Sequence, residues 1–282
     1  MRLDGEVVLI TGGGRGIGAA VAHAFAGVGA NLALISRTAT EVQKVAAELE
    51  SFGVKALPLV ADVSSYSDVE RSVSATLSKF GRIDVLINSA GIYGPIGLLS
   101  ESDIDAWQRT IQINLLGTVN CLHEVLPHMI RRRKGAIINF SGGGAVNAFP
   151  RFSAYATSKA AVVRLTETVA EEVREFNIRV NAIAPGAVNT HLLDQVLAAG
   201  ERAGKEFLAK SKVQKEKGGT PPEKAAELAV FLASPEAEGI TGRLISAVWD
   251  DWKSLPKRLE ELKTSSLYTL RRIDGRQFTE VR

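Results

Sequence analysis

The sequence predicts an α/β protein built on a doubly wound parallel sheet of about seven strands, with helices on both faces. Short aliphatic runs recur along the chain, and each is apolar throughout rather than alternating, as expected for strands buried on both faces. Longer amphipathic segments separate these runs, which indicates parallel strands joined by right-handed crossovers. The composition, 45% hydrophobic and 23% charged, is that of an ordinary globular protein. The expected strands are Val7–Ile10, Leu32–Ile35, Leu57–Val60, Val85–Ile87, Ala136–Phe140, Val180–Ile183 and Leu244–Val248.

The intervening segments carry helix signals. Residues 17–28 place apolar side chains every three or four positions, and Gly29 follows them as a C-terminal cap. Residues 40–52 end in the same way at Gly53, and residues 155–176 form a longer amphipathic segment. Each is expected to cover one face of the sheet.

The organisation of the chain points to one domain, residues 1–249, followed by a charged C-terminal extension, residues 250–282. Within the domain, the polar and lysine-rich segment 191–219 is expected to form a flap beside a site. The extension is either a partly ordered surface tail or a helix that packs on a neighbour. Trp249 and Trp252 either dock this tail on the core or stack on a ligand.

Several classes of protein are disfavoured by charge and composition. The net charge, 34 − 31 = +3, is weak for nucleic-acid binding, and no apolar run approaches the length of a membrane span. The single cysteine fits a reducing compartment, and the N-terminus lacks the features of a secretory signal, so a cytoplasmic location is expected. The four histidines show no metal-ligand spacing, so no metal site is expected.

A glycine-rich turn, Thr11–Gly18, joins the first strand to the first helix. Glycines let backbone amides approach a phosphate, and a helix N-terminus offers free N–H groups and a positive dipole end. The spacing is not G-x-G-x-x-G, because Ile17 stands three residues after Gly14, and it is not that of a P-loop, because Ala19 follows the turn. Its position between strand and helix favours a Rossmann-type dinucleotide site over a purely structural turn.

The end of the second strand bears on the choice of cofactor. Proteins of this kind that prefer NAD usually carry an acid there, whereas this chain has Ser36 and Arg37. Arg37 is suited to pair with the additional phosphate of NADP, Arg15 offers a second contact, and Ser36 presents no repelling carboxylate. Alternatively, Arg37 is an exposed charge at a strand end. NADP(H) is therefore the expected cofactor, with NAD less favoured.

Tyr155 and Lys159 stand four residues apart at the start of a helix and share one face. An ammonium near a phenol favours the phenolate and lowers a pKa normally near 10, which makes the tyrosine a usable acid or base. The pair alone is an unspecific signal. It gains weight because it follows the fifth strand and the loop 141–144, at the edge where open α/β sheets bind ligands.

Several short motifs stand in order along the chain: Thr11–Gly18, Asp62-Val63, Asn88–Gly91, Asn114, Tyr155-Ala-Thr-Ser-Lys159 and Pro185-Gly186 with Thr190. This ordered set resembles that of the short-chain dehydrogenase/reductase family, in its shorter single-domain branch, over about residues 3–248. The resemblance implies an oxidoreductase that interconverts a ketone and a secondary alcohol of a small-molecule substrate, with Tyr155 as acid/base. It further implies a homodimer or homotetramer formed through helices at 103–129 and 155–176.

The same resemblance implies a role for individual residues of the site. Lys159 would hold the ribose hydroxyls, Thr190 would bond the nicotinamide amide, and Asn114 would position a water in a proton relay. Asn114 alternatively relieves a helix kink, and Asn88 alternatively ties neighbouring strands together. The expected catalytic residues are Tyr155, Lys159, Asn114 and Ser141. The expected cofactor-binding residues are Gly12, Gly14, Arg15, Gly16, Ile17, Gly18, Ser36, Arg37, Asp62, Val63, Asn88, Ala90, Gly91, Tyr155, Lys159, Pro185, Gly186, Val188 and Thr190.

One departure from the family pattern concerns the catalytic serine, which usually lies thirteen residues before the tyrosine. Here that position, 155 − 13 = 142, is Gly142, and Ser141 comes one residue too early. A one-residue slip in a strand turns a side chain to the opposite face, although three successive glycines allow a compensating twist. Losing the donor costs about 10²–10³ in rate unless a water replaces it. Gly142 therefore leaves open a catalytically impaired dinucleotide-binding protein. A second alternative is a different reaction on the same fold, that of a non-redox sugar epimerase or dehydratase.

Overall fold

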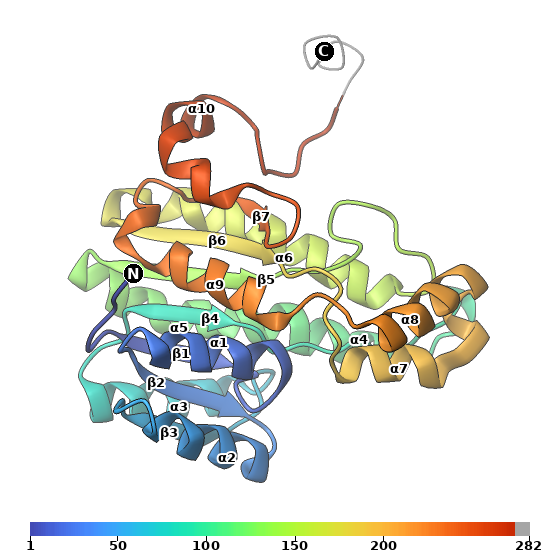
Figure 1. Ribbon diagram of the computed structural model, residues 1–282, viewed down its shortest axis with the longest axis horizontal. Helices are drawn as coiled ribbons and strands as arrows, with labels where there is room; N and C mark the ends of the chain where they lie inside the picture. Colours follow the sequence, from blue (N-terminus) through green and yellow to red (C-terminus); the bar gives the residue numbers. More distant parts are fainter. Residues whose placement is uncertain (274–282) are drawn as a thin grey trace.

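The computed structural model describes residues 1–273, and within them seven parallel strands form one sheet in the order β3-β2-β1-β4-β5-β6-β7 (Figure 1). The predicted doubly wound sheet is therefore confirmed. The strand order reverses between β1 and β4, which opens a crevice at the carboxyl ends of these strands. The strands are β1 (Val7–Thr11), β2 (Asn31–Ser36), β3 (Ala56–Val60), β4 (Val85–Asn88), β5 (Gly135–Phe140), β6 (Ile178–Ala184) and β7 (Leu244–Ser246).

The last strand is shorter than the sequence predicts. It ends at Ser246, whose N–H donates to the Asp250 carboxylate at 2.7 Å. The Ser246 hydroxyl in turn accepts hydrogen bonds from the N–H groups of Val248 and Trp249. This local turn takes the backbone out of the sheet before Val248.

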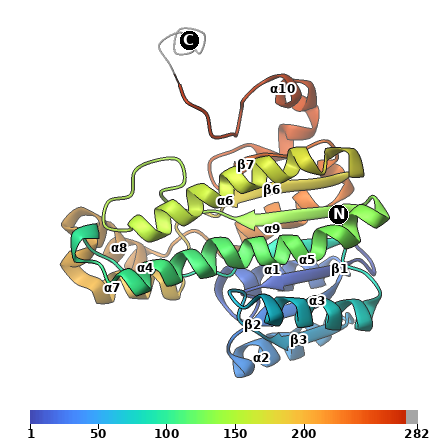
Figure 2. The ribbon, with the colours of Figure 1, turned by 180° about the vertical axis from the view of Figure 1, so that it is seen from behind.

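Helices cover both faces of the sheet. Figure 1 shows α1 (Gly16–Gly27), α2 (Ala39–Glu50) and α9 (Pro222–Ala233) on one face. Figure 2 shows α3 (Tyr66–Phe80), α5 (Gly117–Arg132) and α6 (Ser153–Glu172) on the other. The helix preceding α5 along the chain is α4 (Ile104–Ile111).

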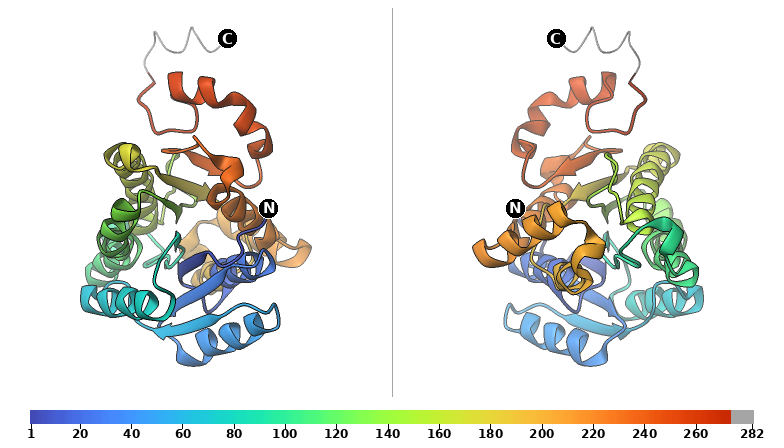
Figure 3. Two further views of the ribbon diagram at one scale, coloured as in Figure 1. Left: turned by 90° about the vertical axis from the view of Figure 1, so that its left-hand side faces the viewer. Right: turned by 90° about the vertical axis from the view of Figure 1, so that its right-hand side faces the viewer.

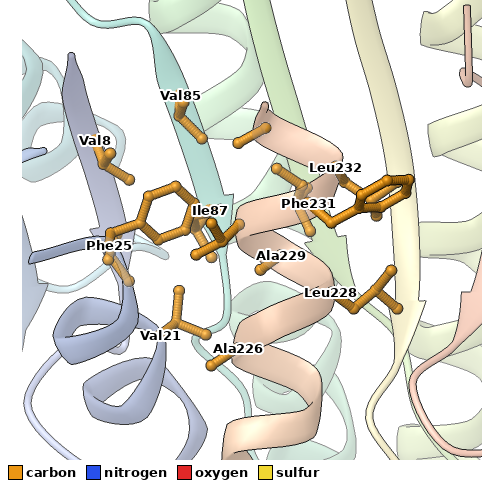
Figure 4. Packing of buried hydrophobic residues seen from close by; sticks show 14 of the residues in the cluster. Val8, Val21, Phe25, Val85, Ile87, Ala226, Leu228, Ala229, Phe231 and Leu232 are labelled. Atoms are coloured by element: carbon orange, nitrogen blue, oxygen red, sulfur yellow. The ribbon is translucent and has the colours of Figure 1, made fainter. Parts of the chain in front are cut away.

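Two apolar cores result, one on each side of the sheet. Along β1 the side chains alternate between them, because Val8 and Ile10 belong to one core and Leu9 to the other. Figure 4 shows the first core, where Phe25 of α1 and Leu228 of α9 lie over the strands. A strand that is covered by helices on both faces of the sheet therefore has an apolar side chain at every position.

The predicted glycine caps lie at the helix ends. Gly29 and Gly53 have φ of +90° and +76°, the left-handed region in which a side chain is strained. The predicted helix 155–176 is interrupted near its end: α6 stops at Glu172, and a separate 3-10 turn covers Arg174–Phe176. No helix within residues 1–273 is long and apolar enough to cross a membrane.

The segment predicted to form a flap folds into two helices, α7 (His191–Ala199) and α8 (Lys205–Lys217), which project beyond the carboxyl ends of the strands (Figure 1). Lys215 of α8 pairs with Asp194 of α7 at 2.9 Å. This exposed ion pair links the two helices at the mouth of the crevice.

The described part of the C-terminal extension packs beside β7 (Figure 3). Trp252 is buried with its ring 5.1 Å from that of Phe231, and α10 (Leu259–Thr264) follows. Trp249, by contrast, is 85% exposed, so one tryptophan of the pair docks the segment and the other does not. The N–H of Leu244 donates to the Tyr268 carbonyl at 2.8 Å, which covers part of the β7 edge. The predicted extension also includes residues 274–282, which lie outside the described residues.

Candidate active site

A cleft of about 590 Å³ opens at the carboxyl ends of the strands, and α7 and α8 contribute to its wall. Most of the residues predicted from sequence meet here although they come from segments far apart in the chain. Those that line it are Gly12, Arg15, Gly16, Ile17, Gly18, Ser36, Arg37, Asp62, Val63, Ala90, Gly91, Ser141, Tyr155, Lys159, Pro185 and Thr190.

Five predicted residues are not part of the cleft wall: Gly14, Asn88, Asn114, Gly186 and Val188. The Asn88 amide donates to Asn139 Oδ1 at 2.9 Å and so ties β4 to β5, the structural alternative for this residue. Gly186 has φ of +85°, and a Cβ built on it would lie 2.6 Å from Val248 Cγ2. Gly186 therefore packs closely against a residue outside the cleft wall.

The glycine turn is packed backbone against backbone. A Cβ on Gly12 would lie 3.0 Å from Ala90 Cα, and one on Gly18 would lie 2.2 Å from the Gly12 carbonyl oxygen. Helix α1 then begins at Gly16 without a side-chain cap and without an acid in its first turn. Its free N–H groups and positive dipole end therefore open toward the cleft, which fits the binding of a phosphate.

The far end of the cleft, at the end of β2, is mixed in charge. Ser36 and Arg37 line it as predicted, together with Arg15. Glu41, which sequence reasoning missed, lines it too, and its Oε1 lies 3.3 Å from Arg15 Nη1. Its position in the first turn of the helix after β2 was the available signal.

Asp62, beyond the end of β3, is held in a polar network. Its Oδ1 accepts from both the N–H and the hydroxyl of Ser64 at 2.9 and 2.7 Å, and its Oδ2 pairs with Arg109. Burial opposes ionisation, but these hydrogen bonds and the guanidinium outweigh it and lower the pKa of Asp62. Arg109 lies 47 residues away in sequence, so nothing local indicated it.

Tyr155 and Lys159 are both buried, at 7% and 5% exposure. Lys159 Nζ donates to the Phe140 carbonyl at 2.8 Å and lies 5.7 Å from the centre of the Tyr155 ring. Burial raises the pKa of Tyr155, with Tyr93 adding to the effect, and lowers the pKa of Lys159 to about 8. The expected lowering of the tyrosine pKa is therefore wrong for the protein alone, because burial penalises the charged phenolate.

This buried ammonium predicts a pH-dependent stability. The Lys159 pKa of about 8 lies below the ordinary value of 10.5, so between these pH values the unfolded chain keeps a proton that the folded protein has lost. The free energy of unfolding therefore rises with pH across this window, and at pH 7 the buried charge costs about 3 kcal/mol.

Lys159→Met should consequently be at least as stable as the wild type at pH 7, and this advantage should shrink by pH 10. Denaturant unfolding of both proteins at the two pH values measures it. A stability difference that is the same at pH 7 and pH 10 would contradict the lowered pKa.

Asn114 lies in a π-helical turn, Gln112–Leu116, between α4 and α5. Its amide nitrogen donates to the Ile92 carbonyl and to the Ser158 hydroxyl, both at 2.9 Å, and its oxygen accepts from the Ile92 N–H at 2.9 Å. A Cβ built on Gly91 would lie 3.4 Å from Asn114 Oδ1 and 3.5 Å from Lys159 Nζ. The turn thus brings the asparagine next to the lysine and fastens the loop after β4.

Ser141 and Gly142 are placed differently with respect to Tyr155. The Ser141 hydroxyl is buried, and its hydrogen bond runs to the Lys159 carbonyl at 3.5 Å. Gly142 is the residue beside the tyrosine, since a Cβ built on it would lie 2.2 Å from the Tyr155 hydroxyl oxygen. The tyrosine hydroxyl therefore occupies the space that a side chain at position 142 would need.

An aromatic cluster, which sequence reasoning missed, packs beside the Tyr155 ring. Tyr93 packs edge-on against Tyr155 with ring centres 4.6 Å apart, and Phe152 lies 5.2 Å from Tyr93. Phe207 of α8 packs on Phe152 at 5.1 Å. The two flap helices are thereby fastened to the tyrosine through apolar contacts.

These features define a Rossmann-like α/β protein with a buried tyrosine–lysine pair in its cleft. The sequence model described as short chain dehydrogenase matches residues 6–200. The chain belongs to the short-chain dehydrogenase/reductase family.

Among its relatives, the 3-oxoacyl-(acyl-carrier-protein) reductase FabG of Thermotoga maritima is 36% identical over 245 residues, which are 87% of this chain and 97% of the relative. Among solved structures, the NAD⁺-bound xylitol dehydrogenase superposes with a TM-score of 0.82 at 30% identity, covering 87% of this chain and 98% of the other. Levodione reductase gives a TM-score of 0.80 at 31% identity, covering 91% and 99%.

Proposed function

We propose that this member of the family is an NADP(H)-dependent oxidoreductase that interconverts a ketone and a secondary alcohol of a small-molecule substrate. The observation that carries the proposal is the Tyr155 side chain, which lines the same cleft as the glycine turn and lies beside Lys159. The names of the relatives, a carbonyl reductase and a polyol dehydrogenase among them, support this class of reaction.

The residues of the cleft fit a nicotinamide dinucleotide. The uncapped first turn of α1 would hold its phosphates, and Arg37 with Ser36 would hold the adenosine end. Thr190 would bond the nicotinamide amide, and its Cγ2 lies next to the glycine turn, 3.5 Å from a Cβ built on Gly16. When bound, the cofactor supplies or accepts a hydride.

The side chains of the protein would carry out the proton transfer that accompanies the hydride transfer. Tyr155 would donate a proton to the oxygen of a ketone, or take one from an alcohol, with its hydroxyl as the acid or base. Lys159, held in place by the Phe140 carbonyl, would favour the phenolate once polar groups of a ligand replace part of the lost hydration. Asn114 would position a water that returns the proton. Ser141 would take no part in this proton transfer, because Gly142 lies beside the tyrosine hydroxyl and the Ser141 hydroxyl bonds to the Lys159 carbonyl instead.

The cofactor assignment is tested by titrating the purified, cofactor-free protein with NADPH and NADH. Because Arg37 pairs with the additional phosphate, NADPH should bind about tenfold more tightly, and Arg37→Gln should remove most of that difference. NADH binding should change by less than a factor of two in the variant. Equal affinities in the wild type would overturn the NADP assignment, and binding of neither would overturn the enzyme proposal.

The two alternatives predict other results. An impaired dinucleotide-binding protein would bind cofactor but transfer no hydride to any carbonyl in a broad panel. A sugar epimerase or dehydratase would copurify with tightly bound cofactor and consume none. Association into a homodimer or homotetramer and a cytoplasmic location remain predictions.

A further inference from the structure

A carboxylate at the adenosine end of the cleft has no part in the proton transfer. Glu41 stands in the first turn of α2 and lines the cleft with Ser36 and Arg37. Its Oε1 lies 3.3 Å from Nη1 of Arg15, the residue immediately before α1. One of the two arginines predicted to bind a phosphate is thus already paired with an acid.

The backbone holds this acid close to the glycine turn. A Cβ built on Gly14 would lie 3.1 Å from Glu41 Cβ and 2.9 Å from Ser36 Oγ. The stem of Glu41 therefore packs beside Ser36 against the turn. Its carboxylate is kept near the groups that a phosphate on the adenosine ribose would contact.

We propose that Glu41 sets the cofactor selectivity by occupying Arg15 and so limiting the preference for a dinucleotide with a 2′-phosphate. This inference rests on the function proposed above. A phosphate carries close to two negative charges, so a neighbouring carboxylate repels it, and Glu41 already engages Nη1 of Arg15 and offsets part of its charge. A ribose hydroxyl in the same place carries no charge and can donate to the carboxylate. Arg37 and Glu41 thus favour opposite cofactors.

The size of the effect follows from exposure. The side chains of Arg15 and Glu41 are 55% and 31% exposed, so their attraction is screened by water and salt. Glu41→Gln should therefore tighten NADPH binding by about two- to fivefold at low ionic strength. NADH should gain nothing from the change, because it carries no 2′-phosphate.

The experiment measures dissociation constants for NADPH and NADH, and for the fragments adenosine 2′,5′-bisphosphate and AMP, at low and high salt. Glu48→Gln is the matched control, because Glu48 lies on the same helix but pairs with His23 at 3.2 Å, outside the cleft. We expect Glu41→Gln to tighten only the 2′-phosphorylated ligands, and high salt to reduce the gain. Equal changes for both cofactors, or the same gain in Glu48→Gln, would overturn the inference.

A double-mutant cycle with Arg15→Gln tests the coupling directly. If Glu41 occupies Arg15, the arginine substitution should weaken NADPH binding more in the Glu41→Gln background than in the wild type. An identical loss in both backgrounds would refute the role of Glu41 even if the single variant tightens binding. If the wild type binds both cofactors and the Glu41 variant leaves the ratio of their dissociation constants unchanged, the inference about Glu41 fails while the proposed function stands. If the wild type binds neither, the proposed function fails with it.

Discussion

Tyr155→Phe should reduce turnover by about 10³-fold while leaving NADPH affinity within a few-fold of the wild type. The substitution keeps the ring and its contact with Tyr93 within the apolar cluster, so the cleft wall is preserved and only the proton donor is lost. Single-turnover rates with a reducible ketone, together with the dissociation constant of NADPH, separate the two effects.

Tyr93→Phe is the matched control for this prediction. It removes a hydroxyl from the ring packed 4.6 Å from Tyr155 without touching the proposed proton donor. It should retain most of the turnover. Near-normal turnover in Tyr155→Phe would exclude the tyrosine as acid/base, and an equally large loss in Tyr93→Phe would mean that the cluster rather than the proton donor is responsible.

Gly142→Ala should lower turnover by about 10²-fold, because displacing a reacting group by about 1 Å has effects of that size. The new Cβ would fall 2.2 Å from the Tyr155 hydroxyl oxygen and 3.0 Å from its Cζ, so the tyrosine must move. Gly142→Ser, which restores the residue usual in the family, should for the same reason fail to raise the activity. Turnover and NADPH affinity, measured together, show whether the loss lies in the chemistry.

Gly143→Ala is the control, because a Cβ there would first meet Phe149 Cε1 at 3.5 Å, an ordinary contact. It should leave turnover within a few-fold of the wild type. Full activity in Gly142→Ala, or a clear gain in Gly142→Ser, would show that the tyrosine works from a position other than the one in this structure.

The chain lacks a serine at position 142, where the family pattern has one. The relatives named above are reductases and dehydrogenases, yet this chain has Gly142 where the family pattern has the serine. The Tyr155 hydroxyl occupies the space that a side chain at position 142 would need. A carbonyl polarised by one fewer donor would need compensation elsewhere in the cleft.

The sequence by itself determined the sheet, the order of strands and helices along the chain, and most of the cleft. Strands covered on both faces are apolar throughout, and left-handed turns such as those at Gly29 and Gly53 favour glycine. Both the strands and the helix ends can therefore be predicted from short stretches of sequence. The tyrosine–lysine pair was readable because two residues four apart in a helix share a face.

The tertiary structure alone decided which distant groups meet at the site. The pairing of Arg15 with Glu41, of Asp62 with Arg109, and the aromatic packing on Tyr155 join different elements and leave no periodic trace in the sequence. The tertiary structure also decided the direction in which the pKa of Tyr155 shifts. Desolvation depends on all the groups packed around the hydroxyl and not only on its neighbours in the chain.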